Sequence, residues 1–147
     1  MGPFPHNAPK SVISAENPAG TDGFEFVEFA HPEPQELRDL FARMGYSHVA
    51  NHKSKPIELW QQGDITYVLN ADPEGFAARF VKEHGPCAPS MGWRVVDAEH
   101  AFTQAVAKGA TPYRGEGKLL DVPAIIGIGG SLLYFVDQYY DTSPYNA

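Results

Sequence analysis

The chain has 147 residues, a length that suits one compact domain or two small modules sharing a core. Its hydrophobic fraction of 43% is enough to build such a core, which excludes disorder along the whole chain. The formal charge of -7, without any basic run, excludes nucleic acid and anionic membrane surfaces as expected partners. Cys87 is the single cysteine, which excludes an intrachain disulfide and is typical of a reducing compartment. Because no secretory signal precedes Lys10 and no segment reaches the roughly 18 apolar residues of a membrane span, we expect a cytoplasmic protein.

The first half of the chain predicts an arm, a strand and a helix. Residues 1–22 contain four prolines and little apolar periodicity, which indicates a flexible or surface-draped arm. The aromatic run over 24–29 predicts a strand. Pro34 lies near the start of the next segment and Gly45 follows its end, as the first turn and the C-terminal stop of a helix require. The apolar stripe of this predicted helix consists of Leu37, Leu40, Phe41 and Met44.

Three more strands and a connecting helix complete the first half. The second and third of these strands flank Gln62-Gly63-Asp64, a plausible tight hairpin. The connecting helix is expected at about 74–84, and a linker over 84–89 follows it. The three strands are predicted at 46–52, 57–62 and 65–70.

The second half repeats the element order of the first. Asp97 is a suitable N-cap for a helix that Gly109 ends. A glycine turn, Gly127-Ile-Gly-Gly130, separates the last two predicted strands. The predicted strands of this half lie at 91–96, 111–113, 119–126 and 131–137.

A repeated strand–helix–strand–strand–strand order predicts an α+β fold built from two βαβββ modules. We place the modules at 23–72 and 90–138 of one domain over 23–138. Residues 139–147 have no clear element and indicate a tail or a severed linker. Each module would form a curved sheet that is too small to close alone, so pairing two of them buries both.

Several segments, taken in this order and spacing, resemble the N-terminal half of bacterial 4-hydroxyphenylpyruvate dioxygenases. The similarity runs from about Asn17 to Asp137, which is most of the chain. The matching segments are Asn17-Pro18, Gly23–Ala30, Asn51–Lys55, Gln62–Asp64, Leu69-Asn70, Glu83–Pro86, Gly92–Asp97, Val122–Ile125, Gly127–Gly130 and Leu133–Asp137.

The resemblance implies a vicinal-oxygen-chelate (glyoxalase-like) fold, of which the family's enzymes have two domains in tandem. It also implies the chemistry of the family, an Fe(II)- and O2-dependent conversion of 4-hydroxyphenylpyruvate to homogentisate in tyrosine breakdown. In that family the iron is held by two His and one Glu of the C-terminal domain, which we expect to lie outside the 147 residues of this chain. We therefore expect no cofactor in this chain, with Fe(II) belonging to the full-length enzyme. The expected partners are the C-terminal catalytic domain and further copies of the chain.

The fold suggests that a metal would lie on the inward face of the first and last strands of the modules. Matching strand to strand puts Glu25 at the first His position, about Gly92 at the second and about Phe135 at the Glu position. One carboxylate, one glycine and one phenylalanine cannot supply a facial triad of two His and one carboxylate. We therefore expect these to be degenerate ligand positions, with no metal site and no catalytic residue in the chain.

The remaining chemistry-bearing residues favour structural roles. Glu25 and Glu28 are three apart on a strand, so they should point to opposite faces and cannot work as a pair. The six histidines are expected to be surface or capping residues: His48 and His52 should share one face of a strand without a carboxylate to complete them, and His100 should lie in the first turn of a helix. Cys87 has no His–carboxylate context. Core packing is the default for the aromatic residues that could line a pocket, namely Phe24, Phe26, Trp60, Trp93 and Tyr134.

Three functions therefore remain open from the sequence. The first is a dioxygenase N-terminal domain with a structural and oligomerisation role, inactive alone. The second is a stand-alone small-molecule-binding module of the bleomycin-resistance kind. The third is a glyoxalase-type metalloenzyme with its site formed by two chains, against which the count of ligand positions argues. Whether the end at Ala147 is natural, and whether a cleft binds any ligand, is left open by the residues.

Overall fold

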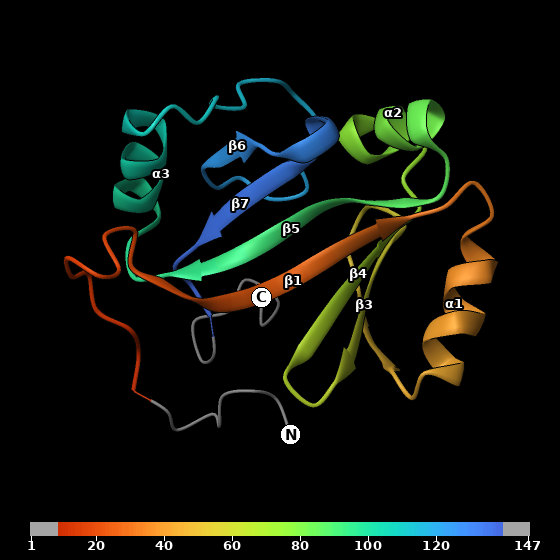
Figure 1. The fold of residues 1–147 in the computed structure, drawn as a ribbon. Coiled ribbons are helices and arrows are strands. Elements are labelled where there is room, and N and C mark those ends of the chain that lie inside the picture. Colours follow the sequence, from red (N-terminus) through yellow and green to blue (C-terminus); the bar gives the residue numbers. More distant parts are fainter. Residues whose placement is uncertain (1–8, 140–147) are drawn as a thin grey trace. The chain divides into compact units, whose positions relative to one another are not determined.

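The computed structural model describes residues 9–139 as a seven-stranded mixed sheet with three α-helices, an α+β fold (Figure 1). Hydrogen bonds connect the strands in the order β2-β3-β4-β1-β5-β7-β6. None of the helices in this part of the chain is long and apolar enough to cross a bilayer. The elements are β1 (Thr21–Ala30), α1 (Pro34–Arg43), β2 (Ser47–Asn51), β3 (Ile57–Gln62), β4 (Ile65–Asn70), α2 (Gly75–His84), β5 (Cys87–Val95), α3 (Ala98–Ala107), β6 (Ala124–Ile126) and β7 (Leu132–Val136).

The chain forms two compact units that divide it differently from the predicted modules. The α1 unit comprises residues 26–91 and 115–119. The α3 unit comprises residues 1–25, 92–114 and 120–147, of which 9–25 and 120–139 are described. Strands β1 and β5 each contribute residues to both units, so a division by chain halves does not match the division by contacts.

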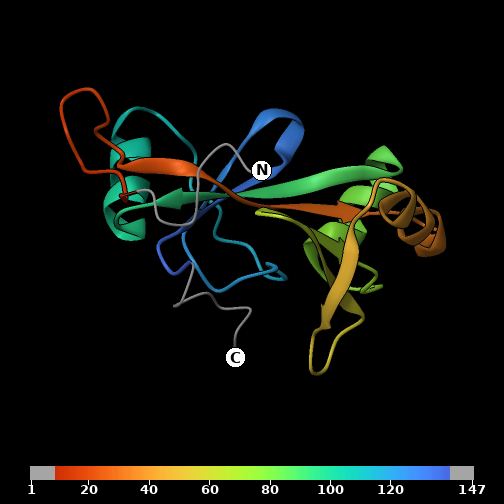
Figure 2. The same ribbon diagram turned by 90° about the horizontal axis from the view of Figure 1, so that it is seen from below.

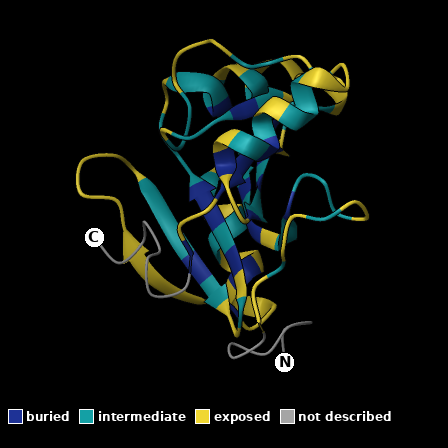
Figure 3. Cartoon of the chain, turned by 90° about the vertical axis from the view of Figure 1, so that its left-hand side faces the viewer, coloured by how far each residue is buried: buried dark blue, intermediate teal, exposed yellow. Residues whose placement is uncertain are grey.

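The α1 unit has the element order predicted for the first half. Strand β1 pairs in parallel with β4 through Val27–Phe29, and β4 forms an antiparallel hairpin with β3. The hairpin closes between Gln62 and Ile65, and Gly63 adopts a positive φ of 57° as its tight turn requires. Strand β2 is exposed along its length (Figure 3), and the loop joining it to β3 projects beyond the strands (Figure 2).

A cluster of aromatic residues forms the core of the α1 unit. Phe41 on α1 is 1% exposed, and its ring meets Trp60 edge-on, with the centroids 5.8 Å apart. Complete burial of one such side chain contributes about 1.5–3 kcal/mol. The predicted helical stripe is only half correct, because Phe41 and Leu37 pack inward while Leu40 and Met44 stay exposed. Gly45 has a φ of 89°, which confirms the predicted glycine stop.

In the α3 unit, helix α3 covers β5, β6 and β7. Asp97 caps it as predicted, with Oδ1 accepting the backbone N–H of His100 at 2.8 Å. The strand predicted at 111–113 is wrong, because only a single bridge, Pro112 to Ile125, forms there. Proline has no N–H to continue a ladder, and the adjacent β6 has only three residues. Strand β5 begins at Cys87, inside the predicted linker.

Candidate functional site

Glu25 at the first predicted ligand position is held by an arginine. Its Oε2 accepts a hydrogen bond from Arg94 Nε at 2.5 Å, and the two side chains are only 4% and 12% exposed. Burial raises the pKa of Glu25 above its ordinary value, and the bond and charge of Arg94 oppose that rise. The Arg94 guanidinium thus places a fixed positive charge against this carboxylate.

The other two predicted positions do not converge with Glu25. Gly92 is buried and has no side chain to offer. Phe135 packs under α3 in a cluster with Val95 and Ala101. Since Val95 follows Arg94 directly on β5, the two point to opposite faces, and Phe135 lies on the face away from the ion pair. Strand matching without the register of β7 does not fix the direction of Phe135, which in the structure packs with Val95.

The residues at these positions do not fit an iron. Among the described residues 9–139, no group of three or more His, Cys, Asp and Glu side chains lies close enough together to hold a metal ion. The carboxylate of Glu25 is paired with the guanidinium of Arg94, where a metal site would need a second ligand. The assignment of Glu25, Gly92 and Phe135 as degenerate ligand positions stays a prediction.

A second buried carboxylate, Glu28, belongs to the α1 unit and is 1% exposed. Ser90 Oγ donates to its Oε2 at 2.6 Å, and Asn70 Nδ2 donates to its Oε1 at 3.2 Å. The Asp72 N–H donates to Asn70 Oδ1, which leaves the amide nitrogen of Asn70 facing Glu28. Both oxygens therefore meet donors, as an ionised carboxylate needs, while burial raises the pKa of Glu28.

This cluster has no activated nucleophile. Burial raises the pKa of the nearby Cys87 thiol, and the charge of Glu28 adds to the rise, whereas a reactive cysteine needs a lowered pKa. Glu25 and Glu28 each have their own partners, so the structure provides no shared-proton pair of carboxylates. Sequence reasoning missed Ser90 and Asn70 because nothing local to either residue indicates a buried carboxylate 62 or 42 positions away.

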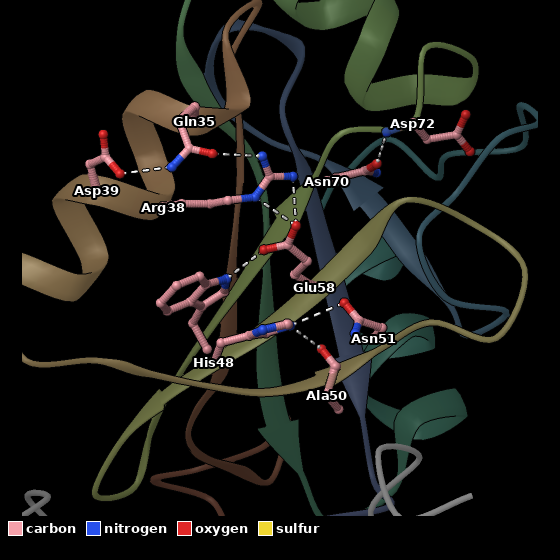
Figure 4. A network of polar contacts seen from close by, with 10 residues as sticks. Gln35, Arg38, Asp39, His48, Ala50, Asn51, Glu58, Asn70 and Asp72 are labelled. Atoms are coloured by element: carbon pink, nitrogen blue, oxygen red, sulfur yellow. Dashed lines mark hydrogen bonds and ion pairs between the residues drawn. The ribbon is translucent and has the colours of Figure 1, made fainter.

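A polar network joins α1 to β3 and β2 (Figure 4). Arg38 donates to Glu58 Oε1 through Nε at 2.8 Å, and Trp60 Nε1 donates to Glu58 Oε2 at 3.0 Å. Burial raises the pKa of Glu58, but these bonds and the charges of Arg38 and His48 outweigh it and hold the pKa below its usual value. His48 stacks on Trp60 with centroids 5.2 Å apart, and its Nε2 lies 3.1 Å from Asn51 Oδ1. This network ties α1 and the edge strand to the sheet and presents no open ligand position.

The remaining candidates of the sequence have structural surroundings. His52 lies beyond the end of β2, so the face that we predicted it to share with His48 does not exist; its Nδ1 accepts the N–H of Ser54. His100 lies in the first turn of α3 as predicted, with Nε2 2.8 Å from the Pro18 carbonyl. Gly129 has a φ of 66° in the turn before β7, which confirms a positive-φ turn ahead of a strand.

The aromatic residues divide between core and surface. The expectation of core packing is confirmed for Phe26, Trp60 and Tyr134, which are 1%, 8% and 0% exposed. Phe24 is 56% exposed, although its ring lies against Trp93 with centroids 4.4 Å apart.

Comparison with known families gives one clear match. Residues 15–147 match the family model described as hydroxyphenylpyruvate dioxygenase, HPPD, N-terminal. Protein MelA of Shewanella colwelliana is 48% identical over 130 residues, which cover 88% of this chain and 38% of MelA. The 4-hydroxyphenylpyruvate dioxygenase of Pseudomonas aeruginosa is 45% identical over 139 residues, covering 91% of this chain and 39% of that protein. A 3-dehydroshikimate dehydratase of the same organism is 38% identical, covering 92% of this chain and 22% of that protein. The chain thus spans about two fifths of the length of the first two relatives.

Solved structures give the same result for the fold. A xylose isomerase-like TIM barrel/4-hydroxyphenylpyruvate dioxygenase fusion protein superimposes with a TM-score of 0.79 at 36% identity, covering 95% of this chain and 21% of that one. A mutant 4-hydroxymandelate synthase of Streptomyces coelicolor gives a TM-score of 0.68 at 17% identity, covering 84% of this chain and 39% of that one. The latter supports the glyoxalase-like fold alone.

Proposed function

Since the chain belongs to the hydroxyphenylpyruvate dioxygenase N-terminal domain family, we propose that it is the non-iron-binding half of a 4-hydroxyphenylpyruvate dioxygenase. In this proposal its role is structural: it packs against a C-terminal catalytic domain and against other copies, and it has no turnover alone. The observation that supports it best is the family match over 15–147, within relatives about two and a half times as long.

The ion pair of Glu25 supports the absence of iron chemistry from this half. A ligand carboxylate must be free to approach a metal, whereas Oε2 of Glu25 is bonded to a buried guanidinium. The reaction of the full-length enzyme, from 4-hydroxyphenylpyruvate to homogentisate with Fe(II) and O2, would then belong to the other domain. Nothing in the proposal requires a residue of this chain to contact the reacting atoms.

The dehydratase relative and the TIM-barrel fusion offer two other settings for the domain, and both have weaker support. The dehydratase relative and the TIM-barrel fusion are 38% and 36% identical to the chain, less than the 45% of the P. aeruginosa dioxygenase, so we favour the dioxygenase setting. A stand-alone small-molecule-binding module is the alternative to either setting. It requires the chain by itself to bind a ligand such as an aromatic keto acid.

Oxygen uptake and product analysis test the proposal. The purified chain is incubated with 4-hydroxyphenylpyruvate, Fe(II) and a reductant, and the full-length P. aeruginosa dioxygenase serves as the positive control. We expect no oxygen uptake and no homogentisate from the chain, and turnover by the chain alone would refute the proposal. Titration calorimetry with 4-hydroxyphenylpyruvate separates the alternative, because micromolar binding without turnover would favour the binding module.

A further inference from the structure

The carboxylate of Asp22, at the start of β1, binds one residue that precedes the first strand in sequence and one that follows the last strand. Its Oδ1 accepts hydrogen bonds from the Ser11 backbone N at 3.2 Å and from Ser11 Oγ at 2.8 Å. Its Oδ2 accepts the hydroxyl of Tyr139 at 3.1 Å. Because the two oxygens serve different segments, Ser11 and Tyr139 bind together without competing.

Tyr139 is built into the α3 unit, although it follows the last strand. It is 1% exposed, and the hydroxyl of a buried tyrosine needs a partner, which Asp22 supplies. Its ring lies 4.5 Å from Lys10 Nζ and 5.6 Å from the guanidinium carbon of Arg94, both within cation–π range. The segment leaving β7 is thus in contact with the arm through Lys10 and with β5 through Arg94.

The arm has two parts that are held differently. The part nearer β1 has its own local bonds: Asn17 Oδ1 accepts the Thr21 N–H at 3.0 Å, and Asn17 Nδ2 donates to the Thr21 carbonyl at 2.9 Å. These bonds involve neither Asp22 nor Tyr139. The contacts of Lys10 and Ser11 described above reach Tyr139 and Asp22 instead. The attachment of residues 10 and 11 should therefore respond to Tyr139, and that of Thr21 should not.

We propose that Asp22 and Tyr139 form a clasp that couples the ordering of the arm around Ser11 to the docking of the chain segment that leaves β7. Release of Tyr139 breaks its bond to Oδ2 of Asp22 and withdraws its ring from Lys10, which loosens Ser11. Release of Ser11 weakens the seat of Tyr139 in return, since coupling between two sites is reciprocal. This inference does not depend on the proposed dioxygenase role. In a longer protein such a clasp would transmit a displacement of the exit segment to the arm.

Hydrogen exchange followed by mass spectrometry tests the forward direction on the 147-residue chain. Tyr139→Phe removes the hydroxyl and keeps the ring, and we expect exchange at the Ser11 amide to rise by at most about fivefold, the full effect of losing one hydrogen bond. The Thr21 amide should keep its wild-type rate. Tyr46→Phe is the matched control, because it removes the hydroxyl of a buried tyrosine in the α1 unit and should leave the Ser11 rate unchanged. Asp22→Asn alters the acceptor of the Ser11 bonds directly, so it shows the rise at Ser11 that follows when those bonds are weakened.

Nitration of Tyr139 tests the reverse direction. Ser11→Ala removes the hydroxyl bond to Asp22 at the other end of the clasp, and we expect faster nitration at position 139, located by fragmentation of the modified peptide. Unchanged exchange at Ser11 in Tyr139→Phe would overturn the proposal, whatever the result for Asp22→Asn. An equal rise at Ser11 and Thr21 would also overturn it, because that pattern indicates general loosening of the unit. Neither outcome depends on the oxygen-uptake assay, so the clasp and the dioxygenase role can fail separately.

Discussion

Removing Arg94 should expose the cost of burying Glu25 without a partner. The Arg94→Met substitution keeps most of the aliphatic stem and deletes the guanidinium, which leaves a carboxylate that is 4% exposed without its charge partner. Breaking a buried ion pair in this way costs about 3–5 kcal/mol. We therefore expect the free energy of unfolding at pH 7 to fall by about that amount. Urea titration monitored by tryptophan fluorescence measures it, and Trp93 lies next to the substituted position.

The loss should shrink as the pH falls. Burial already raises the pKa of Glu25 and Arg94 opposes the rise, so deleting Arg94 raises the pKa further. A carboxyl whose pKa is higher in the folded than in the unfolded state stabilises the folded state as it protonates, so lowering the pH offsets the loss of the guanidinium. The double variant Glu25→Leu/Arg94→Met should recover most of the loss at every pH, because no unpaired charge remains.

A more exposed ion pair provides the control for this substitution. Arg38 is 34% exposed in its pair with Glu58, and Arg38→Met should cost only about 1 kcal/mol. The reasoning is refuted if Arg94→Met lowers the free energy of unfolding no more than Arg38→Met does. It is also refuted if the double variant is as unstable as Arg94→Met alone, because the loss would then not come from an unpaired buried charge.

Three further substitutions probe other parts of the fold. Gly117→Ala should lower the free energy of unfolding by about 2–4 kcal/mol, because φ is +79° and a Cβ would lie 2.7 Å from the Gly75 Cα. In the same urea titration Gly63→Ala should cost only about 1 kcal/mol, because φ is +57° but the space around the residue is open. Glu28→Gln removes a group whose pKa burial raises, so the stability of the wild type relative to this variant should increase as the pH falls from 8 toward the ordinary value of 4.5; a pH-independent difference in melting curves would contradict this. Asp97→Ala should cost about 1 kcal/mol and raise exchange in the first turn of α3 without affecting β4.

The sequence predicted those elements whose signals are local. Strands β3 and β4 were predicted with their observed bounds, because alternating apolar residues flank a glycine turn that sets their pairing. Strand β5 was predicted to start at residue 91 and starts at Cys87, since neighbouring strands extend it through a segment whose prolines indicate a linker. The two compact units follow contacts between distant segments, which element order alone does not determine.

The candidate site was less accessible from the sequence than the fold. The prediction placed Glu25 on the first strand, where it lies in the structure, but only the structure shows its hydrogen bond with Arg94. The direction of Phe135, which packs with Val95, depends on the register of β7 against β5, and a period of two residues cannot supply that register. Tyr139 was assigned to a tail, yet it is buried; the rest of that predicted tail, 140–147, lies outside the described residues.

The ion pair also bears on what building a metal site at the three predicted positions would require. Replacing Gly92 by a histidine would supply a nitrogen ligand, but Arg94 would still occupy the carboxylate of Glu25 with a positive charge that repels a cation. Phe135 could not complete the triad even as a glutamate, because its side chain points into the cluster under α3. At the three predicted positions the obstacles to a metal are therefore the guanidinium paired with Glu25 and the packing around Phe135, in addition to the residue types.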